Sequence, residues 1–153
     1  MIVSGGAIGS SLYLRDQCLE AFSVPTGSCY PNILPGDKIL ANKNAYNKTD
    51  PQRGDIVIFI NPENRHEKFL KRVVAIAGDT VEMKNNELYI NDQKLKLEKL
   101  PDSTLGKMNI NDNENIKGTL YQETNGKTQY DIMLTDAYET TIRDFVKITV
   151  PAN

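Results

Sequence analysis

The stretch KFLKRVVAIAGDTVEM, residues 68–83, decides the fold class of this chain. It is rich in Val, Ile and Phe, and a Gly-Asp pair at 78–79 supplies turn-forming side chains within it. An earlier run, RGDIVIFI at 53–60, has the same character and contains a Gly-Asp pair at 54–55. Apolar, β-branched runs beside turn residues are typical of strands. We therefore expect a mainly β fold.

One residue in the deciding stretch is out of place in an ordinary strand. The period of two places Lys71 on one face and Arg72 on the other, each between apolar neighbours. One interpretation is a lysine whose alkyl stem covers apolar surface while its ammonium stays in water. The other is a lysine whose pKa of about 10.4 falls by several units on burial, so that the neutral amine can act as a base.

The later chain continues the strand pattern. In NNELYINDQKLKL, residues 85–97, the Asn-Asn and Asn-Asp pairs bracket a short apolar run, which predicts hairpin turns. Residues 98–128 become polar and are expected to form a loop excursion. Strands are expected to resume at QYDIML and DFVKITV, within 129–150. We predict antiparallel sheets with an inserted β-ribbon or loop excursion, in one domain over 15–153 that holds a smaller subdomain at about 85–150.

Composition excludes several kinds of site. The net charge is −2 with interspersed signs, so no basic stripe for nucleic acid is expected. The two cysteines, Cys18 and Cys29, are too few for a disulfide framework and lack metal-ligand spacing. The single histidine, His66, lies in a polar, loop-like run. A Ser-His-Asp triad and a metal site are therefore both disfavoured.

The N-terminus is apolar and rich in small residues. The first fourteen residues, before Arg15, are too few to cross a bilayer. They fit the end of a transmembrane helix that emerges at Arg15, and a flexible leader fits equally well. A cleaved secretory signal is less favoured, because no basic region precedes the apolar part.

A second unusual stretch, VPTGSCYPNILPGD at 24–37, holds Ser28 between glycine and cysteine, with prolines on both sides. Gly, Pro and Ser are common turn residues, and a simple turn would explain them. The flanking apolar runs favour a hydroxyl that is held in a fixed direction. Serine needs a base to become a nucleophile, and Lys71 can supply one where no suitable histidine exists. Ser-Lys catalysis fits these residues.

Three stretches together resemble bacterial type I signal peptidases. VPTGSCYPNILPGD is similar to the family's nucleophile box, Pro-Ser-Gly-Ser-Met-x-Pro-Thr-Leu-x-x-Gly-Asp; RGDIVIF is similar to the next box and FLKRVVAIAGDTVE to the lysine box. The boxes occur in family order over roughly residues 15–97. The resemblance implies a membrane-bound serine endopeptidase with a signal-peptidase-like β core. It removes signal peptides after a small-x-small motif such as A-x-A and needs no metal or organic cofactor.

The resemblance also implies roles for single residues. Ser28 matches the nucleophile and Lys71 the general base, while the Thr26 hydroxyl and the Ser28 backbone N–H match the oxyanion hole. Positions that line the pockets for small substrate residues correspond to Val24, Pro25, Cys29, Ile33, Phe69 and Leu70. The implied partners are signal peptides of exported preproteins and membrane lipid, without nucleic acid. The implied location is the cytoplasmic membrane, with the catalytic domain on the extracytoplasmic side.

The match has departures. Cys29 stands where the family has methionine, and Asn32 and Ile33 stand where it has Thr-Leu. Cys29 is adjacent to Ser28 and projects elsewhere, so a small pocket-lining thiol is expected rather than a nucleophile. The family's later box, Gly-Asp-Asn-Arg-x-x-Ser-x-Asp-Ser, has no counterpart before Asn153. A piece of a longer protein, or a divergent relative without that box, would explain this.

Three functions remain open on the sequence. The first is a signal peptidase. The second is another Ser-Lys enzyme with the same core, namely a conjugal-pilus maturation peptidase or the self-cleaving part of an SOS-type repressor; the repressor would need a DNA-binding domain and a cleavage segment that the sequence lacks. The third is an inactive relative that binds signal-peptide ends, which would need neither Ser28 nor Lys71.

Overall fold

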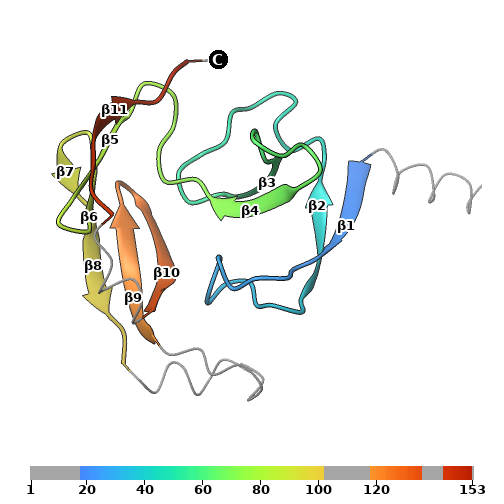
Figure 1. Cartoon of the computed structure of the whole chain (residues 1–153), viewed down its shortest axis with the longest axis horizontal. Helices are drawn as coiled ribbons and strands as arrows, with labels where there is room; N and C mark the ends of the chain where they lie inside the picture. The colour runs from blue at the N-terminus through green and yellow to red at the C-terminus, as the bar shows by residue number, and fades with distance from the viewer. Residues whose placement is uncertain (1–17, 102–117, 136–142, 153) are drawn as a thin grey trace, which may run out of the picture.

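The computed structural model describes residues 18–101, 118–135 and 143–152. In these ranges β-strands dominate, and all strand pairs are antiparallel. The prediction of a mainly β fold with antiparallel sheets is confirmed. Figure 1 shows two groups of strands, one from the N-terminal part of the chain and one from the later part.

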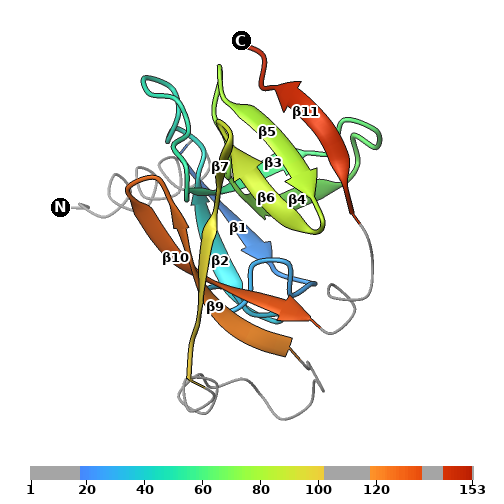
Figure 2. The same ribbon diagram turned by 90° about the vertical axis from the view of Figure 1, so that its left-hand side faces the viewer.

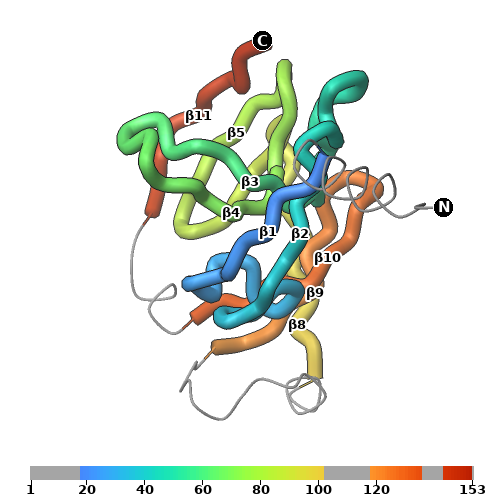
Figure 3. Tube along the Cα trace, turned by 90° about the vertical axis from the view of Figure 1, so that its right-hand side faces the viewer, coloured from blue at the N-terminus to red at the C-terminus, as the bar shows by residue number. Residues whose placement is uncertain are grey.

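The N-terminal group consists of two strand pairs. β1 (Leu19–Ser23) pairs with β2 (Lys38–Asn42), and β3 (Ile56–Ile60) pairs with β4 (Lys68–Arg72). Every second residue of β1 and β2 is partly buried, as expected of strands with one covered face. Figure 3 views this group from its own side, with all four strands in front. The long connection between β1 and β2 carries the Ser28 stretch.

The deciding stretch 68–83 forms two strands rather than one. After β4, the Val73 N–H donates to the Asp55 carbonyl oxygen at 2.8 Å, and the Val73 carbonyl accepts from the Gly54 N–H at 2.7 Å. The chain then turns through Gly78, whose φ of +85° favours glycine, and β5 (Thr80–Lys84) begins. The Gly-Asp pair therefore ends one sheet and starts another.

The hairpin prediction for residues 85–97 is confirmed. β5, β6 (Glu87–Ile90) and β7 (Gln93–Lys94) are consecutive antiparallel strands. The two-residue turns between them have positive φ at all four positions, namely Asn85, Asn86, Asn91 and Asp92. Asn and Asp tolerate this conformation, which tight hairpins require. β11 (Phe145–Thr149) pairs with the other edge of β5, as Figure 2 shows, so the strand expected near 144–150 is also present.

The loop expected over 98–128 is wrong for its last part. β9 (Gly118–Asn125) is an eight-residue strand between β8 (Lys96–Lys99) and β10 (Thr128–Thr135). The polar side chains of β9 are typical of a loop, but here they are buried and have hydrogen-bond partners. The Glu123 carboxylate accepts from the Tyr130 hydroxyl at 2.5 Å, and the Asn125 amide donates to the Val74 carbonyl at 2.7 Å. Residues 102–117 lie outside the described part.

Polar contacts join the two groups of strands. The Arg53 guanidinium donates to Asp79 at the start of the second group, with Nε 2.9 Å from Oδ2. The Arg72 guanidinium lies 4.3 Å from the centroid of the Tyr130 ring. A buried apolar cluster of Val81, Ile90 and Leu95 stabilises the second group. The subdomain limits proposed at 85–150 stay a prediction, and the first fourteen residues lie outside the described ranges.

Candidate active site

The connection between β1 and β2 is held by its own backbone. The Val24 N–H donates to the Asp37 carbonyl at 2.9 Å, and the Gly36 N–H donates back to the Val24 carbonyl at 2.8 Å, which closes the loop at its base. Inside the loop, the Tyr30 N–H donates to the Gly27 carbonyl at 3.1 Å, a tight turn that contains Ser28. The backbone position of Ser28 is therefore held by hydrogen bonds within the loop.

Glycine is required directly before the serine. A Cβ atom at Gly27 would lie 2.0 Å from Cε2 of the Tyr30 ring, far inside van der Waals contact. Tyr30 is buried, so its ring has little space to move away. The close approach of ring and backbone thus explains the glycine, and it links the position of Ser28 to the packing of the tyrosine.

Ser28 reaches strand β4. Its hydroxyl donates to the Leu70 carbonyl oxygen at 3.1 Å. The Cys29 thiol is 3.7 Å from the same oxygen. Leu70 faces Ile58 of β3 in the sheet register, yet its carbonyl is shared with the serine loop, so this group lies on the outer edge of β4. The loop and the lysine strand therefore meet one residue from Lys71.

Lys71 follows Leu70 directly and is exposed. Its ammonium lies 5.8 Å from the centroid of the Phe69 ring. The expectation of a lysine surrounded by apolar side chains is therefore not met in this structure. The ammonium stays in water while the neighbouring ring contacts it, as in the alternative interpretation drawn from the sequence.

Ser28 and Lys71 nevertheless share one cavity. We call it the Ser28 cavity; its volume is about 350 Å³. Seven predicted site residues line it: Val24, Pro25, Thr26, Ser28, Phe69, Leu70 and Lys71. The sequence analysis missed six further lining residues, which are Phe22, Ser23, Ile39, Ile58, Glu67 and Lys68. Phe22, Ile39 and Ile58 carry a signal that was available, since they are apolar residues of the short strands β1, β2 and β3.

Two predicted pocket residues lie elsewhere. Cys29 is buried and lines a smaller cavity of about 180 Å³, which Ser28 also borders from the other side. Burial raises the pKa of the Cys29 thiol, although nearby Arg72 opposes the shift. A protonated, buried thiol is a poor nucleophile. Ile33 lines a third cavity between the two strand pairs of the first group.

The groups predicted for an oxyanion hole are available. Thr26 is exposed at the wall of the Ser28 cavity. Among the described residues, neither its hydroxyl nor the Ser28 N–H has a hydrogen-bond partner. Two free donors beside a serine hydroxyl can stabilise the oxyanion of an acyl-transfer reaction. Thr26, Ser28 and Lys71 thus line one cavity, and the two donors predicted for the oxyanion hole are unpaired among the described residues.

Metal binding finds no support in the described ranges. No group of three or more His, Cys, Asp or Glu side chains there is arranged to hold an ion. His66 is exposed in the connection between β3 and β4, beyond the residues that line the Ser28 cavity.

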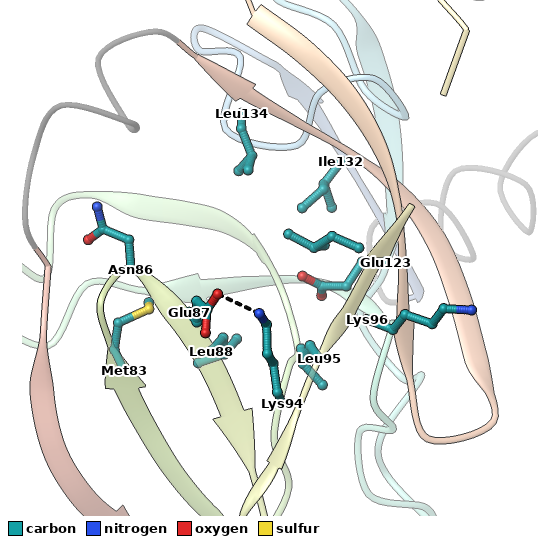
Figure 4. A pocket seen from close by; sticks show the side chains of 11 residues that line it. Met83, Asn86, Glu87, Leu88, Lys94, Leu95, Lys96, Glu123, Ile132 and Leu134 are labelled. Carbon is teal, nitrogen blue, oxygen red and sulfur yellow. Dashed lines mark hydrogen bonds and ion pairs between the residues drawn. The ribbon is translucent and has the colours of Figure 1, made fainter. Parts of the chain in front are cut away.

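A separate cavity of about 450 Å³ lies between the sheet of β5 to β7 and the sheet of β8 to β10. Figure 4 shows its side chains, including the ion pair of Glu87 with Lys94 and the carboxylate of Glu123. Burial raises the pKa of Glu123, whose carboxylate accepts from the Tyr130 hydroxyl. None of the predicted site residues lines this cavity, so it is distinct from the Ser28 site.

The family of this chain is shown by its similarity to known proteins. A family model described as "Signal peptidase, peptidase S26" matches residues 1–150. The chain belongs to the peptidase S26 family. All three of the resembling stretches lie inside the matched range, so the resemblance drawn from them is confirmed.

Individual S26 relatives agree. A protein named signal peptidase I from Pseudomonas aeruginosa is 37% identical over 135 residues, covering 78% of this chain and 44% of the relative. One from Aquifex aeolicus is 41% identical over 83 residues, covering 50% of this chain and 32% of the relative. One from Rickettsia akari is 27% identical and covers 88% of this chain and 56% of the relative. The chain thus spans about a third to just over half the length of these S26 relatives.

The first fourteen residues were expected to form either the end of a transmembrane helix or a flexible leader. In the part of the chain that the structure describes, no helix has the length and apolar character needed to cross a bilayer. The residues on which that expectation rests are not among those described.

Proposed function

We propose that this chain is the catalytic part of a serine endopeptidase that removes N-terminal signal peptides from exported preproteins. The observation that carries the proposal is the Ser28 cavity, in which a serine on a rigid loop and a lysine on β4 border one space in a member of the S26 family. In this proposal, cleavage takes place on the outer side of the cytoplasmic membrane. The partners are signal peptides and membrane lipid.

The proposed peptide site is the edge of β4 away from β3, which pairs with no other strand in the described ranges. Backbone groups on an open strand edge pair readily with an extended peptide. The Leu70 carbonyl lies on that edge and now accepts from Ser28, so a peptide that takes over this acceptor also frees the hydroxyl. The cavity walls, including Val24, Pro25 and Phe69, then choose small side chains before the cut.

The chemistry is acyl transfer. Ser28 Oγ attacks the scissile carbonyl carbon while its proton passes to the neutral amine of Lys71. The Thr26 hydroxyl and the Ser28 N–H donate to the oxyanion. Collapse breaks the peptide C–N bond, and the Lys71 ammonium returns a proton to the leaving amine. The same amine then deprotonates a water that hydrolyses the ester.

Cleavage of a quenched fluorescent peptide with Ala-x-Ala before the cut, in detergent micelles, tests the proposal. The chain is compared with Ser28→Ala, and Cys29→Ala is the matched control for the adjacent thiol. We expect cleavage after the second alanine, its loss in Ser28→Ala, and retention in Cys29→Ala, with products identified by mass spectrometry.

Cleavage that survives Ser28→Ala, or that occurs at another bond, would contradict the proposal. Peptide binding without turnover by the unsubstituted chain would instead favour the inactive relative that binds signal-peptide ends.

A further inference from the structure

A cavity next to the Ser28 cavity has no role in the mechanism above. It lies between the β1–β2 and β3–β4 pairs, and we call it the hairpin cavity; its volume is about 630 Å³. Its walls are mainly apolar, with Ile33, Ala41, Ile56 and Phe59 among them. It is therefore almost twice the size of the Ser28 cavity and suits an uncharged, apolar occupant.

The two cavities adjoin each other. Five residues line both of them: Phe22, Ile39, Ile58, Lys68 and Leu70. Of these two cavities, Ser28 and Lys71 line only the Ser28 cavity, so the shared wall lies away from the reacting groups. A peptide that fills the Ser28 cavity with its small residues therefore points its preceding residues at the hairpin cavity.

An ion pair lies at this boundary. Lys68 Nζ on β4 is 2.7 Å from Glu20 Oε1 on β1, and it also lies 4.9 Å from the Phe22 ring centroid. The pair bridges two strands of different sheets, β1 and β4, and Lys68 belongs to both cavity walls. The hydrogen bond from Lys68 lowers the pKa of Glu20 and so favours its charged carboxylate. An exposed pair of this kind is weak and can open when a ligand replaces it.

We infer that the hairpin cavity binds the apolar segment of the substrate that precedes the small residues, after the Glu20–Lys68 pair opens to join the two cavities. The inference rests on the proposed function. Its occupant follows from substrate chemistry, because secretory signals carry an apolar stretch of about 7–15 residues before the small-residue cleavage site. The apolar walls and the shared boundary match such a segment.

Two fluorescent peptides test this assignment with Ser28→Ala chain, by anisotropy. The short peptide carries Ala-x-Ala and two lysines for solubility; the long peptide adds six leucines between the lysines and Ala-x-Ala. We expect at least about tenfold tighter binding of the long peptide, since a few buried leucines suffice for that factor. Equal binding of the two peptides, or no binding of either, would overturn the inference.

A cavity-filling variant locates the added binding. Ala41 lines the hairpin cavity only, whereas Ala21, on the neighbouring strand, is exposed and lines neither cavity. Ala41→Phe should remove most of the advantage of the long peptide and leave short-peptide binding unchanged, while the matched control Ala21→Phe changes neither. Equal losses in both variants, with unfolding temperatures that match the parent chain, would overturn the assignment.

The ion pair has its own readout. Glu20→Gln should tighten long-peptide binding about two- to fivefold, because an exposed pair of this strength no longer has to open. High salt should bring the parent chain to the same affinity. Weaker or unchanged binding in Glu20→Gln would refute the opening step.

Failure of this inference is distinguishable from failure of the proposed function. If the unsubstituted chain cleaves the short peptide and the long peptide has no advantage, only the hairpin cavity assignment fails. If the long peptide binds in an Ala41-dependent way and no peptide is cleaved, only the proposed function fails.

Discussion

Ser28 donates its hydroxyl hydrogen to the Leu70 carbonyl oxygen, 3.1 Å away and 42 residues later in the chain. This single bond fixes the serine loop to the strand that carries Lys71. It also occupies the hydroxyl, so that no hydrogen bond joins Ser28 to Lys71 in the described residues. Attack on a substrate therefore requires the hydroxyl to leave the carbonyl and turn to the lysine amine, as catalytic hydrogen bonds often form only in the substrate complex.

The lysine role predicts the result of a conservative substitution. Lys71→Arg keeps the positive charge but provides a guanidinium that does not deprotonate in proteins. We expect the cleavage rate to fall by about 10²-fold or more, the usual contribution of a general base. Peptide affinity should change little, since the charge is kept.

Cleavage and binding of the same Ala-x-Ala peptide separate these quantities. Lys38→Arg, in which an exposed lysine of β2 outside the Ser28 cavity is changed in the same way, is the control and should retain turnover. Full activity of Lys71→Arg would show that another group takes the serine proton.

A second prediction concerns the glycine that precedes the nucleophile. Gly27→Ala places a Cβ atom 2.0 Å from the Tyr30 ring, so either the ring or the loop must move. Such overpacking costs about 1–3 kcal/mol of the free energy of unfolding. Because the loop carries Ser28, cleavage should fall more than substrate affinity.

Denaturant unfolding and peptide kinetics measure both effects. In a Tyr30→Leu background the clash is relieved, and the added cost of Gly27→Ala should largely disappear. Additive costs of the two substitutions would argue against the ring contact as the cause.

Local signals in the sequence were enough for much of the fold. Strands β3, β4 and β5 follow from apolar β-branched runs, and the turns at 85–86 and 91–92 follow from asparagines that accept positive φ. The serine loop was also readable, because Gly27 and its prolines act through nearby residues. Each of these features depends on contacts close in sequence.

Other features depend on distant partners and could not be read. β9 was taken for a loop because Glu123 and Asn125 are polar, yet Tyr130 and the Val74 carbonyl satisfy them inside the fold. The exposure of Lys71 depends on whether distant parts of the chain pack against its side chain, which no local pattern encodes. Cys29 and Ile33 line other cavities for a similar reason. The packing of the strand pairs against each other decides which cavity each residue lines, and that packing depends on distant contacts.

Arg72 is a residue whose importance the sequence did not indicate. Its guanidinium donates to the Gly54 carbonyl at 2.8 Å and to the Asn32 side chain in the serine loop, and it stacks on Tyr130. Arg72→Lys keeps the charge but cannot make these contacts together. We expect a loss of about 1–3 kcal/mol in the free energy of unfolding, from the lost charged hydrogen bonds.

Arg72→Lys should also slow the reaction, because Arg72 holds the serine loop in position through Asn32. The rate of turnover should fall more than substrate affinity, because Asn32 and Lys71 lose their common support. Arg65→Lys, a change of the same kind in the exposed loop between β3 and β4, should alter neither quantity. If Arg72→Lys and Arg65→Lys change turnover and affinity equally little, Arg72 does not position the serine loop.

The last prediction concerns acid stability and the Arg53–Asp79 pair. Hydrogen bonds from Arg53, together with those from the Ile76 N–H and the Asn91 amide, lower the pKa of Asp79 from 3.8 to about 2. The carboxylate is almost fully buried, so the pair is not screened like a surface pair. Because the folded pKa lies below the unfolded one, Asp79 stabilises the fold above about pH 4, and this contribution is lost as the pH falls toward 2.

Asp79→Asn should therefore lower the free energy of unfolding by about 2 kcal/mol at pH 7, the equivalent of that shift. The difference from the parent chain should shrink between pH 4 and pH 2, the window set by the two pKa values. Denaturant unfolding across this range measures it, with Asp50→Asn in an exposed loop as the control. A pH-independent difference would mean that the amide disturbs packing, since only an ionised carboxylate in the folded state produces convergence at low pH.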